Sequence, residues 1–283
     1  LFPVNADFLD SKGDDFGKVD PANILYNGPF ILKSFTSKSV LEYKKNPNYW
    51  DAKNVFVDDV KLTYYDGSDQ DALVRNFSEG VYSFARLYPN SSSFAGVQEK
   101  YKDNIIYSMQ TATSFYFNFN LDRKTYNHTS KTTDAEKTAQ QEAVLNKSFR
   151  QAINFAYDRK AYGAQSQGEE GATKIIRNLL VPPSFVTLDG KDFGDVVASK
   201  MVNYGQVWQN VNFADAQDAY YNADKAKEAF TQAKKELEAK GVQFPIYLDL
   251  PVDQSYKKGV QEASSFKQSI ESVLGADNVV IDI

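Results

Sequence analysis

The stretch from Phe244 to Ile283 constrains the fold more than any other part of the sequence. It consists of an apolar run FPIYLDLPV, a segment with helical spacing over 255–274, and a second apolar run NVVIDI. Antiparallel strands can be joined by a short turn, whereas a helix between two strands is typical of a parallel pair. The spacing therefore predicts a parallel βαβ unit and an α/β fold with a mixed sheet.

Two further segments have the apolar spacing of amphipathic helices. One is expected from an Asn146 cap to a Gly163 end, and the other from Asn222 or Asp224 to Gly241. The first places apolar side chains at i, i+3, i+4 and i+7, at Phe149, Ala152, Ile153 and Ala156. The second lines one face with Ala226, Ala229, Phe230, Ala233 and Leu237.

The part of the chain before these helices has mainly the short apolar runs of strands. A hairpin, further strands and two short helices are expected there. The hairpin strands are PFILKSF and SVLEYKK, the further strands lie within 57–66, 81–87 and 104–110, and the helices lie within 68–80 and 91–102. Residues 164–220 read as rich in loops.

The run SFYFNFNL, residues 114–121, alternates aromatic and polar side chains. As a strand it would pack Phe115, Phe117 and Phe119 inward and turn Tyr116, Asn118 and Asn120 the other way. The polar segment 122–141 that follows is the best candidate for a boundary between structural units.

Composition and missing motifs exclude several classes of function. The net charge of −5 with scattered lysines argues against a nucleic-acid partner, and no apolar run is long enough to cross a bilayer. With no cysteine and one histidine, His128, in a polar stretch, metal capture and His- or Cys-based catalysis have little support. The phosphate-loop, dinucleotide, zinc-protease and nucleophile-elbow motifs do not occur, so the chain is expected not to be an enzyme and to need no cofactor.

Three features together resemble the extracytoplasmic peptide-binding proteins of ABC importers, the family 5 solute-binding proteins. ILYNGPFILKSF resembles the family's strand-opening Gly-Pro-Phe motif, here Gly28, Pro29 and Phe30, with Gly supplying an unusual backbone angle. NKSFRQAINFAYDRK is similar to its Arg-Ala-Ala-Asp-Arg helix. That motif comprises Arg150, Ala152, Ala156, Asp158 and Arg159. The order of segments from FSEGVYSF through NIIYS and SFYFNFN to this helix is also similar, most of all to streptococcal oligopeptide-binding lipoproteins.

The resemblance implies a two-lobed, periplasmic-binding-protein-like fold (class II), of which this chain would be an incomplete part. Residues 1–113 would belong to lobe I and 114–283 to most of lobe II, with the crossover strand near 114–121. The family's lipidated N-terminus would precede Leu1, and a strand returning to lobe I would follow Ile283. Such lobes close over an extended peptide.

The same resemblance suggests which side chains contact ligand. Tyr116, Asn118 and Asn120 would face the cleft, while Arg86, Leu87 and Tyr88 follow a strand where the family places cleft residues. Trp208 would wall a side-chain pocket. Each has an ordinary alternative: bonds to neighbouring loops for the first set, a surface ion pair for Arg86, and anchoring of its loop for Trp208.

The expected function is capture of oligopeptides outside the cell and delivery to the membrane permease of an ABC importer, by a monomeric receptor. Alternatives are a receptor for a metal, haem or sugar on the same fold, a cleft hydrolase such as a glycosidase, or an adhesion module. If the chain is the inside of a longer protein, it should bind peptides more weakly than the complete protein does.

Overall fold

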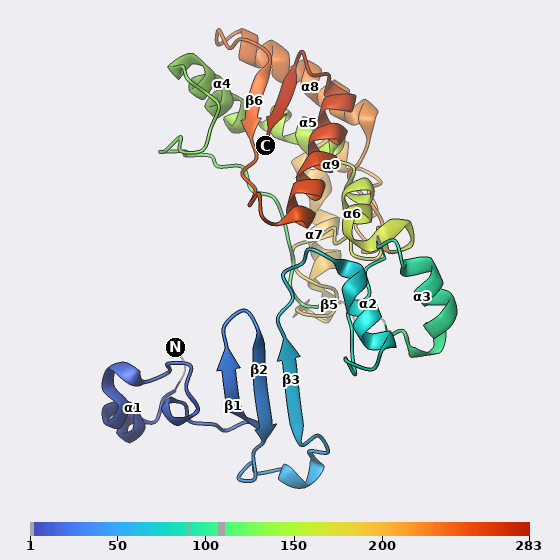
Figure 1. The fold of residues 1–283 in the computed structure, drawn as a ribbon. Helices are drawn as coiled ribbons and strands as arrows, with labels where there is room; N and C mark the ends of the chain where they lie inside the picture. Colours follow the sequence, from blue (N-terminus) through green and yellow to red (C-terminus); the bar gives the residue numbers. More distant parts are fainter. Residues whose placement is uncertain (1–2, 90, 107–110) are drawn as a thin grey trace. The chain divides into compact units, whose positions relative to one another are not determined.

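The structure is a computed structural model that describes residues 3–89, 91–106 and 111–283 (Figure 1). The chain divides into two compact units, Leu1–Asp69 and Gln70–Ile283. Each unit has its own secondary structure and is described separately.

The first unit is built on a three-stranded antiparallel sheet of order β1-β2-β3. Its strands are β1 (Phe30–Thr36), β2 (Val40–Lys45) and β3 (Asp59–Thr63), so the expected hairpin and following strand are confirmed. Phe35, Leu41 and Leu62 are cross-strand neighbours in this register. A short helix α1 (Ala6–Lys12) precedes the sheet, with 3₁₀ turns at Gly13–Asp15, Pro21–Asn23 and Ala52–Asn54.

The Gly-Pro-Phe motif is fixed by a buried asparagine. The Asn46 side chain donates to the Gly28 carbonyl at 2.9 Å, and the Asn46 backbone donates to the Pro29 carbonyl at 2.8 Å. Gly28 has no positive φ, and a Cβ placed on it would meet no atom within 4 Å. The expectation that Gly28 supplies an unusual backbone angle is therefore wrong. The motif is instead fixed by the bonds from Asn46, which go to main-chain carbonyls that any residue carries.

The second unit contains most of the helices and the parallel strands. Its helices are α2 (Gln70–Ser78), α3 (Phe94–Tyr101), α4 (Asp134–Leu145), α5 (Lys147–Ala156), α6 (Arg159–Gly171), α7 (Phe193–Met201), α8 (Ala223–Glu238) and α9 (Lys257–Leu274). Its strands are β4 (Thr187–Leu188), β5 (Lys191–Asp192), β6 (Ile246–Asp249) and β7 (Val279–Asp282), with 3₁₀ turns at Lys102–Asn104, Val202–Tyr204 and Gln206–Trp208.

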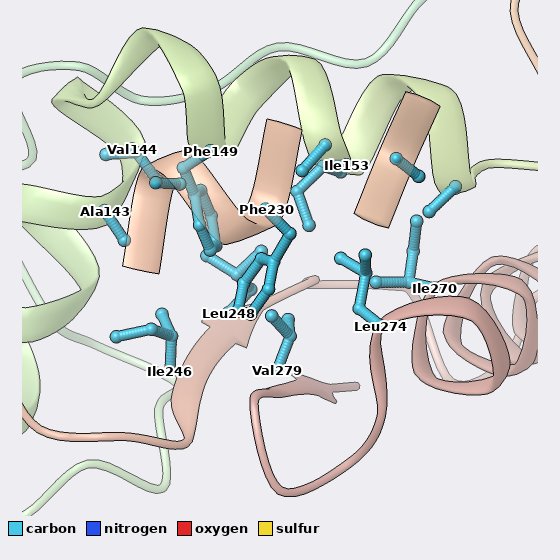
Figure 2. Packing of buried hydrophobic residues seen from close by; sticks show 14 of the residues in the cluster. Ala143, Val144, Phe149, Ile153, Phe230, Ile246, Leu248, Ile270, Leu274 and Val279 are labelled. Atoms are coloured by element: carbon cyan, nitrogen blue, oxygen red, sulfur yellow. The ribbon is translucent and has the colours of Figure 1, made fainter. Parts of the chain in front are cut away.

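The predicted βαβ unit is confirmed, since β6 and β7 pair in parallel and α9 connects them. Helices α5 and α8 pack together over this pair, and α9 lies against it as well (Figure 2). The largest fully buried side chains of this core are Phe149, Phe155, Leu237, Ile246, Ile270, Val279 and Ile281. The apolar faces read from the sequence are the ones the core buries, because only these faces remove enough apolar area from water.

The helix expected over 146–163 is two helices. Asn146 caps α5 as expected, with its side chain accepting from the Phe149 amide at 2.9 Å. The chain then breaks at Tyr157, and the Asp158 side chain caps α6 by accepting from the Ala161 amide at 2.8 Å. A cap residue needs a non-helical backbone, so the aspartate of the family motif starts a helix rather than continuing one.

The polar segment 122–141 is not a connection between units, because both of its flanks belong to the second unit. Its second half forms α4, which Thr133 and Glu136 begin with a reciprocal capping box. Ala143 and Val144 of this helix are buried. The assignment of residues 1–113 and 114–283 to two lobes remains a prediction.

Some expected strands are absent from the described part of the chain. Residues 81–87 and 114–121 pair with no strand there, and of 104–110 only 104–106 are described, also without strand pairing. An extended run becomes a strand only when a neighbour supplies the ladder of hydrogen bonds. The loop-rich reading of 164–220 needs correction too, because α6 extends to Gly171 and α7 lies within it.

Candidate ligand-binding cavity

The second unit holds a cavity of about 2350 Å³. Its wall comes from the loop before α3, the extended segment 111–120, helix α6, the segment 174–180, the carboxyl end of β6 and helix α9. Ligand sites in α/β folds characteristically lie at the carboxyl ends of parallel strands. This cavity is large enough for a ligand of several residues rather than a small metabolite alone.

The extended segment 114–121 contributes both polar and aromatic side chains to this wall. Tyr116, Asn118 and Asn120 line the cavity and are exposed. The Phe117 ring also lines the cavity, and it lies 4.9 Å from the Phe266 ring and 5.8 Å from the Tyr162 ring. These aromatic contacts hold the segment against α6 and α9, and leave amide and hydroxyl groups facing the cavity.

The inward packing expected for the three phenylalanines is only partly correct. Phe119 packs against the buried core, and Phe117 is held by aromatic rings although 46 % of its surface stays exposed. Phe115 is 94 % exposed and lines the cavity. Strict alternation of faces would require a paired strand, which the described segment does not form.

Arg86 and Leu87 also line the cavity, whereas Tyr88 does not. The Arg86 guanidinium lies 4.8 Å from the centre of the Tyr88 ring, which can orient it. Among the described residues, no carboxylate is within ion-pair distance of Arg86. Arg86 is thus an exposed cation at the cavity with its guanidinium available to an anionic group.

Trp208 does not line the cavity, so its position does not favour direct contact with a ligand. Its ring is 5.4 Å from the Phe155 ring and 6.0 Å from the Tyr220 ring, and it packs against the core. The alternative reading, in which Trp208 anchors its loop, matches these contacts.

The Asp-Arg pair of the family motif organises the segment after α6. Arg159 pairs with Asp218, with an Nη2 to Oδ1 distance of 2.5 Å, and donates to the Asn178 side chain at 2.6 Å. Its guanidinium also stacks 4.5 Å from the Tyr220 ring. Arg150 acts elsewhere and donates to the Val144 carbonyl at the end of α4 at 2.7 Å. Both guanidinium groups thus bond to backbone, amide or carboxylate groups inside the unit, and Arg159 also lines the cavity.

An ionic cluster at the carboxyl end of β6 was not foreseen from the sequence. Asp249 accepts from Lys131 at 2.5 Å and from Arg123, and the Lys131 side chain is only 1 % exposed. Burial raises the pKa of Asp249, but the hydrogen bonds from Lys131 and Arg123 outweigh it and leave the pKa below its usual value. Asp249 follows an apolar run, which is the only local signal that sequence offered.

Two tyrosines beneath the extended segment are protected from ionisation. Burial raises the pKa of Tyr157, and burial together with the nearby Glu262 raises the pKa of Tyr162 to about 12. The Tyr162 hydroxyl lies 3.4 Å from Glu262. Both rings therefore remain neutral at physiological pH and present aromatic surface with hydroxyl donors.

Metal and membrane features are missing from the described ranges. They contain no group of three or more His, Cys, Asp or Glu side chains able to hold a metal ion, and no helix long and apolar enough to cross a membrane. His128 is exposed in a loop at the cavity with a φ of 55°.

Helices packed on parallel strands beside a large polar and aromatic cavity define a chain of the periplasmic-binding-protein type. A family model described as bacterial extracellular solute-binding proteins, family 5 Middle, matches residues 1–279. The chain therefore belongs to the family 5 solute-binding proteins.

Curated relatives carry peptide-related names. The chain is 74 % identical over all 283 residues to the oligopeptide-binding protein AliB of Streptococcus pneumoniae, and covers 43 % of that protein. It is 56 % identical over 284 aligned positions to the oligopeptide-binding protein SarA of Streptococcus gordonii, again covering 43 %. The chain thus spans less than half the length of these relatives.

Solved structures share the fold. OppA of Listeria monocytogenes bound to peptide aligns with a TM-score of 0.64 at 22 % identity, covering 99 % of this chain and 46 % of that one. The pheromone receptor PrgZ aligns with a TM-score of 0.62 at 20 % identity, covering 100 % and 47 %. The expected α/β, periplasmic-binding-protein-like class is confirmed.

Proposed function

We propose that the protein containing this chain captures oligopeptides outside the cell and delivers them to the membrane permease of an ABC importer. The observation that carries the proposal is 74 % identity over the whole chain to a protein named for oligopeptide binding. The large cavity supports it, since amide, hydroxyl and aromatic groups line it together with charged side chains such as Arg86 and Glu262. Binding without bond cleavage follows as the mode of action, because the relatives named here are binding proteins.

The chemistry of the cavity suits the main chain of an extended peptide. Asn118 and Asn120 each offer a carbonyl acceptor and an amide donor, and Tyr116 adds a hydroxyl beside a ring face. Groups of this kind bind the peptide bonds common to all sequences, while the aromatic surface accepts varied side chains. Leu87 lines the cavity beside Arg86, while Tyr88, which lies outside the lining, contributes by orienting the Arg86 guanidinium.

Arg86 is assigned to a carboxylate of the peptide. Its guanidinium is exposed at the cavity, oriented by Tyr88 and free of a carboxylate partner among the described residues. In a charge-assisted pair it can donate two parallel hydrogen bonds to one carboxylate. Replacing Arg86 with Ala should then weaken a peptide with a free carboxyl terminus more than its amidated counterpart.

The lobe assignment and the setting of the protein belong to the same proposal. Residues 1–113 are assigned to lobe I and 114–283 to lobe II, with 114–121 as the crossover between them. The complete protein is placed outside the cytoplasmic membrane, anchored through a lipidated N-terminus and active as a monomer. These assignments rest on family membership and on the resemblance to streptococcal lipoproteins.

The decisive experiment is calorimetric titration of the protein encoded by the full reading frame with a pool of mixed peptides. Binding to peptides, with the peptides recovered intact, supports the proposal. Binding to nickel, haem or a sugar but not to peptides would replace it with another ligand class on the same fold. Turnover that is lost on substitution of a carboxylate would identify a hydrolase instead, and surface binding without peptide affinity an adhesion module.

A second titration compares this 283-residue chain with the full reading frame. Binding by the chain alone should be much weaker, because lobe closure uses contacts from both lobes. Equal affinities would contradict the idea that important contacts lie outside residues 1–283.

A further inference from the structure

We infer that Arg177 is a positioning residue that aligns the segment 111–120 with the cavity. The inference rests on the proposed function, since it gives that segment the task of contacting the ligand. It is carried by the placement of the Arg177 guanidinium between a buried polar network and the start of the segment.

The Arg177 guanidinium touches the segment at three points. It donates to the Thr111 and Thr113 carbonyls at 3.3 Å each and to the Ser114 hydroxyl at 3.2 Å. The Ser114 hydroxyl in turn donates to the Leu180 carbonyl at 2.8 Å. One side chain therefore fixes the backbone on both sides of residue 112, directly before the ligand-facing run.

Arg177 is itself held from behind by buried groups. Its Nε lies 3.4 Å from Asp215, and both side chains are largely buried, 13 % and 16 % exposed. The Arg177 carbonyl accepts from Arg159 at 3.2 Å. The Asn178 side chain also accepts from Arg159, and the Asn178 backbone amide donates to the Asp215 carboxylate. The motif arginine at the start of α6 is thus connected through this network to the segment that lines the cavity.

The segment has few other constraints on its backbone. Across the parts of the chain that the structure describes, the backbone groups of 115–120 make no hydrogen bond. Packing of the Phe117 and Phe119 rings holds its middle, and the Gln141 side chain holds its far end by donating to the Leu121 carbonyl at 2.7 Å. With so few bonds, loss of the contacts at residues 111–114 leaves Tyr116 and Asn118 free to shift.

The test compares Arg177→Met with Arg150→Met in the protein encoded by the full reading frame. Arg150 is a matched control, because it also donates to a backbone carbonyl, that of Val144, but lies away from the segment. Three quantities are measured for each variant: peptide affinity by calorimetry, the rate of chymotrypsin cleavage after Phe115, Tyr116 and Phe117, and the thermal midpoint. Arg177→Met should weaken peptide binding about tenfold, since misplaced contact groups lose much of their binding value. It should also speed cleavage at 115–117, because a segment that opens more often is cut more often.

Arg150→Met should lower the thermal midpoint while leaving affinity within twofold and cleavage at 115–117 unchanged. If Arg177→Met fails to fold, Arg177→Lys replaces it. A lysine keeps the charge beside Asp215 but lacks the planar fork that reaches two carbonyls, so cleavage at 115–117 should still rise. Unchanged cleavage at 115–117 in the folded Arg177 variant, or equal losses of affinity in both methionine variants, would overturn the inference.

The two proposals fail in different ways. Wild-type protein that binds no peptide refutes the proposed function, and the cleavage rate at 115–117 then still decides whether Arg177 positions the segment. Wild-type protein that binds peptide, with Arg177→Met behaving like Arg150→Met, keeps the function and removes the positioning role.

Discussion

Replacement of Asp249 with Asn should cost the second unit a large part of its stability. Asp249 is 9 % exposed and shared by two cations, Lys131 and Arg123. Lys131 is the more vulnerable partner because its side chain is 1 % exposed and its ammonium ion lies 2.5 Å from Asp249. Arg123 keeps other contacts, with its guanidinium 4.1 Å from the Tyr126 ring and its Nε donating to the Thr125 carbonyl at 2.9 Å.

The expected loss in free energy of unfolding follows from stranding Lys131. Removing one partner of a buried ion pair costs about 3–5 kcal/mol, since the remaining charge is left in a poorly solvated place. An asparagine still offers Lys131 a neutral acceptor, which puts the expected loss near the lower limit, about 3 kcal/mol. Adding Lys131→Met to Asp249→Asn should restore part of this, because the stranded charge is then gone.

Urea unfolding followed by circular dichroism measures this loss. Asp122→Asn is the control, because Asp122 pairs with Lys124 on the surface, where both side chains are more than three-quarters exposed, and its unfolding midpoint should not move. A loss below about 1 kcal/mol for Asp249→Asn, or one equal to that of the control, would refute the argument from burial.

The contribution of Asp249 to stability should also depend on pH in the acid range. The pKa of Asp249 is lowered in the folded protein, so its contribution is present above the ordinary aspartate pKa of about 3.9. It is lost as the pH falls through the lower folded value. As the pH falls below about 5, the free energy of unfolding should therefore decrease more for the wild-type protein than for Asp249→Asn. Parallel decreases in the two proteins would contradict a lowered pKa for Asp249.

Three other predictions concern the core and the aromatic groups. Phe149→Ala should cost about 3–5 kcal/mol in urea unfolding, because the ring is fully buried between α5 and α8 and leaves a cavity, and a loss under about 1 kcal/mol would be inconsistent with this core. Trp208→Ala should lower the thermal midpoint but leave peptide affinity within about twofold. A large loss of affinity with an unchanged thermal midpoint would restore the pocket-wall role. The pKa of Tyr162 is raised to about 12, so its contribution to stability is complete below about pH 10 and falls as the pH rises from about 10 to about 12. Tyr162→Phe should reduce this loss of stability at alkaline pH, and an unchanged pH profile would contradict the prediction.

The sequence by itself determined the elements whose apolar spacing is complete over several turns or strands. The faces of α5 and α8, the hairpin β1-β2 and the parallel pair β6-β7 follow from local periodicity, because each buries one side against neighbours within the chain. The family was also readable from Arg150, Asp158 and Arg159, whose side chains cap helix ends and connect loops. Such capping chemistry depends on short spacings that a sequence displays directly.

Only the tertiary structure decided what the extended and polar segments do. The residues 114–121 alternate like a strand, yet without a pairing partner in the described chain they are placed by Phe117, by Arg177 and by Gln141. The Asp249 cluster joins residues more than one hundred positions apart, and no local pattern predicts such a contact. Pairing and ion clusters depend on what the fold brings together, whereas burial of a periodic face depends mainly on the residues themselves.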